Sequence, residues 1–191
     1  MGALSLIMCL LRNGNAVFEG DFQGELPGVI VHTDLDGRKI LVVQNRCELA
    51  VEAVRMGCSV DKVTRLLEWR EFEVFVSNVF ESFGYNVKHD YRFKHRGVRR
   101  QIDVLAIQGR RTFSVDCKHW SKTRGLGVYV QKQVERSALL AEFLSNKEVY
   151  PLMVTLGFNG FVDGVPVVAS YALRDFLLNL DQYVDMLRVL R

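Results

Sequence analysis

An acidic residue and a lysine lie two positions apart at the end of an apolar run of the sequence. Residues 112–118 read Thr-Phe-Ser-Val-Asp-Cys-Lys and end in Asp116, Cys117 and Lys118. Because side chains alternate between the two faces of a β-strand, Asp116 and Lys118 share one face and Cys117 takes the other. An acid and a lysine therefore project side by side from the end of an apolar strand, an arrangement that can carry chemistry. Taken alone, the motif also fits a solvated ion pair at an exposed strand end.

A second acid, Asp103, lies inside the apolar run Gln-Ile-Asp-Val-Leu-Ala-Ile at residues 101–107. Burying a carboxylate is costly unless the group is paired or binds a metal ion. If the two runs form a hairpin through Gly109, Asp103 approaches Asp116. Two neighbouring carboxylates repel each other, and a divalent cation between them offsets the repulsion. The pair therefore predicts a metal site at this hairpin.

The elements that must position these residues follow from the hydrophobic periodicity. Apolar residues between Phe72 and Phe83 recur at helical spacing, Gly84 ends that helix, and Glu73 lies near its start. The pattern then predicts strands at 86–93, 101–108 and 112–118, a helix at 129–144, strands at 150–156 and 165–168, and a helix at 173–187. This order, α-β-β-β-α-β-β-α, predicts an α/β fold with a mixed sheet flanked by helices.

The first third of the chain is predicted to be a separate, small α+β module. β-Rich runs meet at the Asp-Gly turn signal around Gly37, and two short helical stretches follow. Nothing in this module suggests chemistry. We therefore expect a small module at residues 1–66, of unknown role, and a catalytic domain at residues 67–191.

The helix with Glu73, the run around Asp103 and the Asp116–Lys118 motif together resemble the PD-(D/E)XK restriction-endonuclease-like superfamily. Within it, Phe72-Glu73 and Phe83-Gly84-Tyr85 resemble Mrr-like restriction endonucleases and archaeal Holliday junction resolvases. The resemblance covers residues 69–156. Ile102 stands where the motif has proline, and Asp116 where Mrr-like proteins more often carry Glu or Gln.

This resemblance implies an αβββαβ core and metal-assisted phosphodiester hydrolysis. It assigns catalytic roles to Asp103, Asp116, Lys118 and Glu73. Mg²⁺, or Mn²⁺ as a substitute, would be held by Asp103, Asp116, Glu73 and the backbone carbonyl of Cys117. Hard oxygen ligands without a histidine cluster favour these ions over Zn²⁺. Lys118 would position the attacking water or stabilise the negative charge that develops on the phosphate.

Basic residues gather between residues 88 and 100, although the net charge of the chain is only +3. Such a cluster suits the DNA backbone, because each phosphate contact releases condensed counterions. A solvated basic hairpin is the alternative. The residues expected to contact DNA are Lys94, Arg96, Arg99 and Arg100, together with Lys122 and Arg124 of a later basic loop.

Composition allows a full hydrophobic core, with 49% hydrophobic and 25% charged residues among 191. The four cysteines form neither a CxxC pair nor a zinc pattern. The apolar start, residues 3–11, lacks a basic leader and is shorter than the ~20 residues that span a membrane. We therefore expect a cytoplasmic protein without membrane association.

The expected function is a Mg²⁺-dependent DNA endonuclease, either Mrr-like or structure-specific. The expected partner is DNA, and a homodimer is left open. A catalytically inactive nuclease-fold protein that binds DNA or serves in an assembly is the first alternative. A structural protein whose basic hairpin is incidental is the second, and lack of DNA affinity at low salt would favour it.

Overall fold

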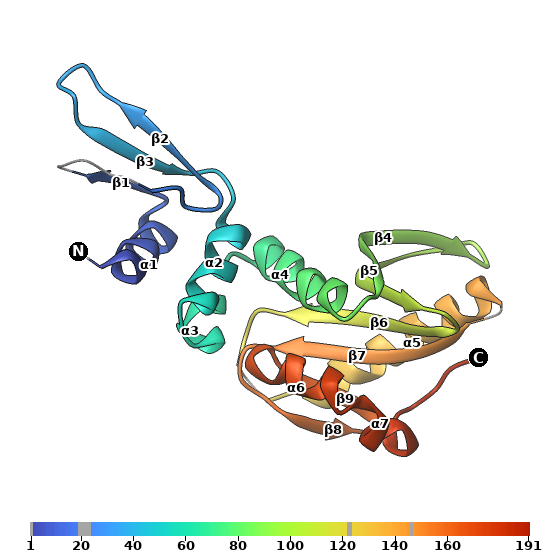
Figure 1. Ribbon diagram of the computed structural model, residues 1–191. Coiled ribbons are helices and arrows are strands. Elements are labelled where there is room, and N and C mark those ends of the chain that lie inside the picture. Colours follow the sequence, from blue (N-terminus) through green and yellow to red (C-terminus); the bar gives the residue numbers. More distant parts are fainter. Residues whose placement is uncertain (1, 19–23, 122–123, 146) are drawn as a thin grey trace. The chain divides into compact units, whose positions relative to one another are not determined.

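The computed structural model describes residues 2–18, 24–121, 124–145 and 147–191 (Figure 1). The chain divides into two compact units, Met1–Phe72 and Glu73–Arg191, so the boundary falls inside a helix, α4 (Trp69–Ser82). The division expected after residue 66, and the role of the first module, stay predictions. None of the helices in the described part of the chain has the length and apolar character that crossing a membrane requires.

The first unit combines three short helices with a small antiparallel sheet. Its elements are α1 (Ala3–Asn13), β1 (Asn15–Phe18), β2 (Val29–Thr33), β3 (Lys39–Val43), α2 (Arg46–Arg55) and α3 (Val60–Thr64), with strand order β1-β3-β2. Asn45 caps α2, because its side chain accepts hydrogen bonds from the backbone N–H groups of Cys47 and Glu48. The expected hairpin and the two helices after it are present, whereas the helix over the apolar start was not predicted.

The second unit is built on a six-stranded mixed sheet of order β4-β5-β6-β7-β9-β8 (Figure 1). Its strands are β4 (Asn86–His95), β5 (Val98–Gln108), β6 (Arg111–Lys118), β7 (Glu148–Thr155), β8 (Gly160–Val162) and β9 (Val165–Ala169). The strands β6, β7 and β9 run parallel, and the remaining neighbours pair antiparallel. The predicted α/β class with a mixed sheet is confirmed.

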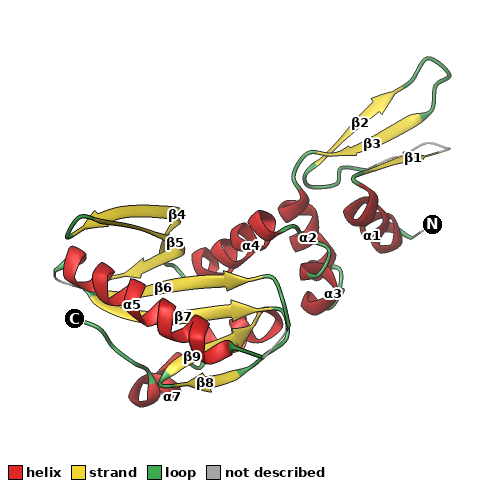
Figure 2. Ribbon diagram, turned by 180° about the vertical axis from the view of Figure 1, so that it is seen from behind, coloured by secondary structure: helices red, strands yellow, loops and turns green. Residues whose placement is uncertain are grey.

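Helices cover both faces of this sheet. Phe113 of β6 packs against Phe80 of α4, with ring centroids 5.7 Å apart. Ser114, the next residue, accepts a hydrogen bond from Gln133 of α5 (Leu126–Leu144). Consecutive strand residues face opposite sides, so α4 and α5 cover opposite faces. Figure 2 shows α5 lying across its face of the sheet.

The end of the chain differs from the prediction. Instead of one helix over residues 173–187, the structure has the short helices α6 (Leu173–Leu178) and α7 (Leu180–Tyr183), followed by the 3₁₀ turn η2 (Val184–Met186). The break falls at Asn179, whose backbone angles, φ −105° and ψ 20°, lie outside the helical range. The Asp175 carbonyl accepts both the backbone N–H of Asn179, at 3.0 Å, and its side-chain amide, at 2.8 Å, and asparagine is a residue that favours helix ends.

The hairpin formed by β4 and β5 extends through most of residues 94–100, which were expected to connect two shorter strands. Backbone pairing continues to His95 opposite Val98 and leaves only Arg96 and Gly97 in the turn. Both turn residues have positive φ, 49° and 79°, as a type I′ turn requires. Glycine at the second position makes this tight turn accessible. The basic residues therefore project from a regular two-stranded ladder.

Candidate functional site

The strands β5 and β6 separate at the level of the two predicted metal-binding acids. Their backbone pairing begins at Gln108 opposite Arg111 and ends at Val104 opposite Val115. Continuing the same register would set Asp103 opposite Asp116. Instead, Oδ2 of Asp103 accepts the backbone N–H of Cys117 at 2.8 Å. A side-chain carboxylate thus takes the acceptor role of a strand carbonyl, and the two strands form a fork beyond it.

The opposite edge of β5 is also irregular at this level. Pairing with β4 is present at His89 opposite Val104 and at Tyr91 opposite Ile102, but not between them at Asp90. Asp90 has a φ of 52°, an unusual conformation for a residue with a side chain. In this register Asp90 lies opposite Asp103, so the pairing of β5 is interrupted on both sides at the predicted metal-binding acid.

Asp116 lies in the fork between two cations. Its side chain is only 2% exposed, and its oxygens are 2.9 Å from Lys118 Nζ and 3.2 Å from Arg136 Nη1. Lys118 belongs to the same strand, whereas Arg136 comes from α5. The ammonium of Lys118 also lies 6.0 Å from the centre of the Tyr129 ring. The sequence-predicted pair of Asp116 and Lys118 is thus in direct contact.

Asp103 is buried, and its burial disfavours the ionised form of its carboxyl group. Its side chain lies in the same fork and the residue is 6% exposed. Burial, and after it the negative charge of Asp116, raises the pKa of the Asp103 carboxyl, against the opposing effects of the Cys117 N–H, Lys118 and Arg136. The charge of Asp116 therefore disfavours the ionised form of Asp103, as expected for an acid placed beside a second carboxylate.

Glu73 approaches the same region from α4. It is 5% exposed, and its Oε2 lies 3.1 Å from Nε2 of His89, a distance at which an imidazole N–H can donate to the carboxylate. Burial raises the pKa of the Cys117 thiol well above its ordinary value, and the charges of Asp103, Glu73 and Asp116 act in the same direction. All three predicted acids therefore lie close enough to this buried thiol to act on its pKa.

The carboxylate oxygens of the acids suit Mg²⁺ or Mn²⁺ better than Zn²⁺. In the described part of the chain, no three or more His, Cys, Asp or Glu side chains are grouped so that they could hold a metal together. The metal role predicted for Glu73, like those of Asp103 and Asp116, stays a prediction. Mg²⁺ is commonly bound by one or two carboxylates, with water and substrate phosphates completing its shell. Two buried carboxylates in a fork fit that pattern, and the metal roles of the acids stay predictions.

The sequence analysis missed two polar side chains that α5 directs at β6. Gln133 is fully buried and donates from Nε2 to the Ser114 carbonyl at 2.6 Å. Arg136, three residues later, reaches Asp116. The sequence contained a signal for these two residues, because helical spacing places Gln133 and Arg136 close to the face of α5 on which Val130 and Leu140 are buried. Polar residues on a core-facing stripe indicate a specific partner across the interface.

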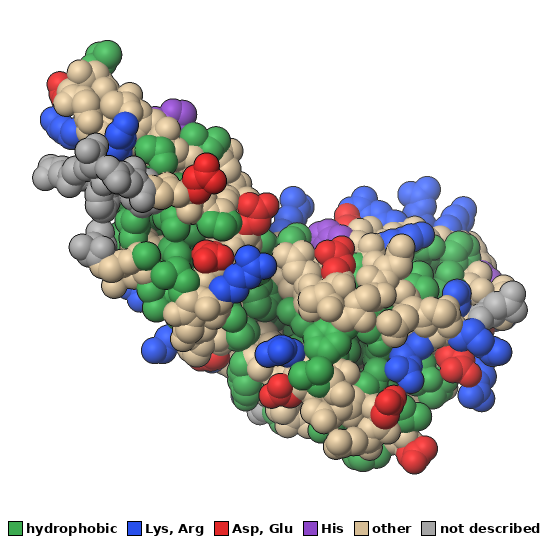
Figure 3. Space-filling model, in the orientation of Figure 1, with side chains coloured by type: hydrophobic (Ala, Val, Ile, Leu, Met, Phe, Trp, Pro, Cys, Tyr) green, Lys and Arg blue, Asp and Glu red, His purple; other side chains and the backbone are tan. Residues whose placement is uncertain are grey.

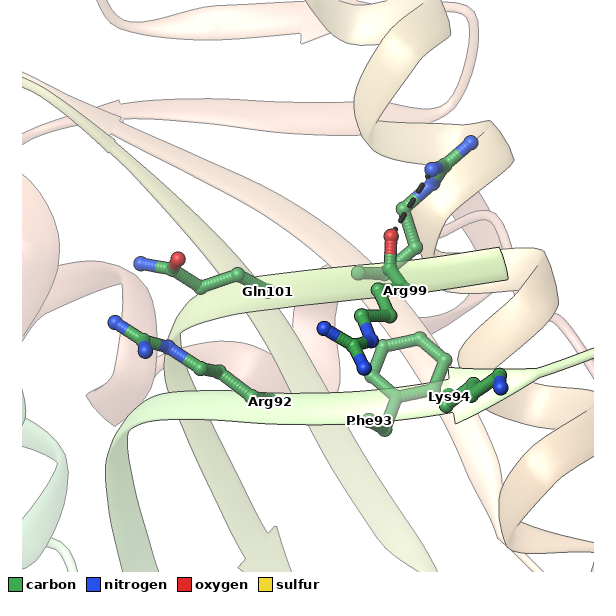
Figure 4. A pocket seen from close by; sticks show the side chains of 6 residues that line it. Arg92, Phe93, Lys94, Arg99 and Gln101 are labelled. Carbon is green, nitrogen blue, oxygen red and sulfur yellow. Dashed lines mark hydrogen bonds between the residues drawn. The ribbon is translucent and has the colours of Figure 1, made fainter. Parts of the chain in front are cut away.

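Basic side chains line a hollow of about 750 Å³ on the β4–β5 hairpin (Figure 4). The lining residues are Arg92, Phe93, Lys94, Arg99, Arg100 and Gln101. Figure 3 shows Lys and Arg side chains gathered over this hairpin. A concave surface with several cations is suited to a chain of phosphates.

The cations of the hairpin differ in whether an acid neutralises them. Arg92 pairs with Asp90 at 2.9 Å, and Arg96 pairs with Glu142 at 3.1 Å. By contrast, among the residues that the structure describes, no carboxylate pairs with the predicted DNA contacts Lys94, Arg99 and Arg100. Of the later basic loop, Arg124 is exposed and Lys122 lies outside the described residues.

Comparison with known proteins gives a family match over the region that carries the site. Residues 68–155 match the family model described as NERD, nuclease-related domain. An uncharacterized protein of Archaeoglobus fulgidus is 28% identical over 123 residues, which cover 62% of this chain and 95% of that protein.

Three solved structures resemble the chain more remotely. A protein of unknown function, AF1548, has a TM-score of 0.43 and 15% identity over 60% of this chain and 67% of its own. VC1899 from Vibrio cholerae has a TM-score of 0.45 and 14% identity, and the match covers 96% of this chain and 51% of VC1899. Can2 from Sulfobacillus thermosulfidooxidans, solved with cyclic tetra-adenylate, has a TM-score of 0.42 and 9% identity, with 95% and 51% covered. The chain therefore spans about half the length of VC1899 and Can2.

The match of residues 68–155 to a nuclease-related domain supports the predicted resemblance to the PD-(D/E)XK-like superfamily.

Proposed function

We propose that this protein is a divalent-metal-dependent endonuclease that hydrolyses phosphodiester bonds of DNA. The observation that carries the proposal is the fork between β5 and β6, where Asp103 and Asp116 are buried beside the ammonium of Lys118. Burying two carboxylates next to each other costs free energy, and this arrangement is common where a metal ion is held. The match to a nuclease-related domain supports the same reading.

Asp103 and Asp116 would hold Mg²⁺ or Mn²⁺, with water and phosphate oxygens as the remaining ligands. When bound, the ion would supply a Lewis acid and lower the pKa of a water molecule. Lys118 would stabilise the negative charge that grows on the phosphate, since its Nζ lies at the same carboxylate. Glu73 would act through His89, which it contacts at 3.1 Å, by orienting the imidazole at the edge of the fork.

The β4–β5 hairpin would bind the DNA backbone through Lys94, Arg99 and Arg100. These cations lack acidic partners in the described part of the chain and line a common hollow together with Arg92. Contacts to phosphates position a nucleic acid without reading its sequence. We therefore infer that the protein selects DNA by its structure or modification rather than by a palindromic site.

A catalytically inactive DNA-binding protein is the second candidate. The specific observation in its favour is that Asp116 already contacts two cations, at 2.9 and 3.2 Å, on the carboxylate that a metal would need. Such a protein would bind DNA with a strong dependence on salt concentration and would never cut it.

One assay separates the two candidates. The full chain is incubated with supercoiled plasmid, branched DNA and single-stranded DNA in Mg²⁺, in Mn²⁺ and in EDTA, while fluorescence anisotropy measures binding of the same DNAs. Cleavage in Mg²⁺ or Mn²⁺ but not in EDTA is the expected result. Binding of DNA without cleavage under any condition would establish the inactive alternative. Absence of binding at low salt would refute both.

A further inference from the structure

A side chain outside the predicted set bridges the two arms of the fork. Nη1 of Arg136 lies 3.2 Å from Oδ1 of Asp116 on β6 and 3.4 Å from the carbonyl oxygen of Gln101 on β5. Both contacts are made where the β5–β6 ladder has already ended at Val104. The guanidinium therefore connects strands that no longer pair with each other.

The formal charges of the fork balance in the protein without a metal ion and without DNA. Two carboxylates, Asp103 and Asp116, face two cations, Lys118 and Arg136. A divalent ion bound to the carboxylates would leave these cations in excess. The site would then suit a phosphodiester, and even better the more negative transition state of its hydrolysis. One of the two cations must then exchange Asp116 for the phosphate.

Arg136 is the cation that is free to make this exchange. Lys118 is tied to Asp116 through the strand that carries both residues. Arg136 reaches the fork from a separate helix, α5, so its contact with Asp116 is not imposed by the strand. The side chains of the two cations are similarly exposed, 21% for Arg136 and 23% for Lys118. Among the residues that the structure describes, Nη2 and Nε of Arg136 have no hydrogen-bond partner, so these donors remain for a ligand. Meanwhile Gln133 anchors α5 by its hydrogen bond to Ser114, so only the Arg136 side chain has to move.

We propose that Arg136 is a phosphate-binding residue of this site. In the protein without metal and DNA it holds Asp116, and when both are bound its guanidinium transfers to the non-bridging oxygens of the phosphate at the fork. A planar guanidinium with several donors matches two phosphate oxygens at once, which an ammonium does not. The inference rests on the proposed function, because it requires that metal and DNA meet at this fork.

The first test measures Mn²⁺ binding to the DNA-free full chain by electron paramagnetic resonance. The proteins compared are the wild type, Arg136→Gln and Lys132→Gln. Lys132 is exposed on the same helix and has no described acid partner, so its replacement removes an equal charge as a matched control. Arg136 competes with the ion for Asp116, so Arg136→Gln should bind Mn²⁺ as tightly as the wild type or more tightly. Weaker Mn²⁺ binding would mean that Arg136 only supports Asp116, and would overturn the proposal.

The second test measures DNA binding by anisotropy in Ca²⁺, in place of Mg²⁺ to slow cleavage, and again in EDTA. Arg136→Gln should weaken binding about tenfold in Ca²⁺, the size expected for one charge-assisted contact. In EDTA the loss should stay below about twofold, because the guanidinium remains on Asp116. Lys132→Gln should affect both conditions alike. Equal losses of Arg136→Gln in both conditions, or no loss in either, would overturn the proposal.

Mn²⁺ binding and DNA cleavage by the wild type distinguish a failure of the proposed function from a failure of the inference alone. If the wild type neither binds Mn²⁺ nor cuts DNA, the proposed function fails and the inference fails with it. If the wild type does both and only the Arg136→Gln results deviate, the inference alone fails. Should Arg136→Gln unfold in a thermal melt, Arg136→Lys carries the same tests, because it keeps a cation for Asp116 but loses the planar pair of donors. A loss specific to Ca²⁺ is again expected, and its absence would refute the role.

Discussion

Asp103 is expected to have two separable duties, and a pair of substitutions distinguishes them. Its carboxylate accepts the backbone N–H of Cys117 at 2.8 Å where β5 leaves β6, and it is also the proposed metal ligand. Asp103→Asn keeps an acceptor oxygen but removes the charge. Asp103→Ala removes both. Metal binding and cleavage should be lost in both variants, whereas the free energy of unfolding should fall only in the alanine variant.

The size of the difference follows from the burial of the hydrogen-bond partners. Asp103 is 6% exposed and Cys117 is fully buried, so water cannot readily replace the lost acceptor. A buried donor left unsatisfied costs about 1–3 kcal/mol. Asp103→Ala should therefore be less stable than Asp103→Asn by about 1–3 kcal/mol, with a fall in Tm of roughly 2–4 °C per kcal/mol.

The pH dependence has a definite sign. Burial and the charge of Asp116 raise the pKa of Asp103 in the folded protein. Between the ordinary pKa of an aspartate and this raised value, the folded state binds more protons than the unfolded state. The free energy of unfolding therefore falls as pH rises through that window. Asp103→Asn cannot titrate, so it should gain stability relative to the wild type as pH rises, and this advantage should vanish below the ordinary aspartate pKa, about 3.9.

The assays are urea unfolding of the wild type and both variants between pH 4 and 8, and Mn²⁺ binding at neutral pH. Equal stability of the asparagine and alanine variants would refute the role of the Cys117 hydrogen bond. Mn²⁺ affinity that survives in Asp103→Asn would refute the metal site, whatever the stability data show. A wild type that gains stability relative to Asp103→Asn on going from acid to neutral pH would contradict the raised pKa of Asp103, which burial and then the charge of Asp116 cause.

The remaining predictions concern the other arm of the fork and the basic hairpin. Asp116→Asn and Lys118→Ala should each lower Mg²⁺-dependent cleavage by at least about 100-fold while circular dichroism and DNA affinity in EDTA stay close to those of the wild type. Cleavage that persists in either variant would place the active site elsewhere. Replacing Arg99 and Arg100 together by alanine should weaken binding of all duplexes alike and flatten the slope of log affinity against log salt by up to roughly two units. Arg174→Ala, on α6, is the control, and an unchanged slope with a lowered Tm would make the hairpin cations structural.

The sequence alone determined the class of fold and pointed to the residues that are proposed to carry the chemistry. Strand alternation assigned Asp116 and Lys118 to one face, and the structure has them in contact at 2.9 Å. The order of elements predicted a mixed sheet with flanking helices, which is confirmed. These features depend on residues close in the chain, where hydrophobic periodicity and short turn signals act locally. The metal, catalytic and DNA-binding roles of the residues stay predictions.

Only the tertiary structure decided how distant elements meet at the site. Strand register and the docking of helices determine three features of the site. The strand β5 leaves β6 at Asp103, Glu73 contacts His89, and Arg136 reaches Asp116 from α5. A hydrophobic stripe shows which face of a helix is buried but not which strand residue its polar members will meet. Packing between segments far apart in the chain determines which residues meet, and the periodicity of a single segment does not predict it.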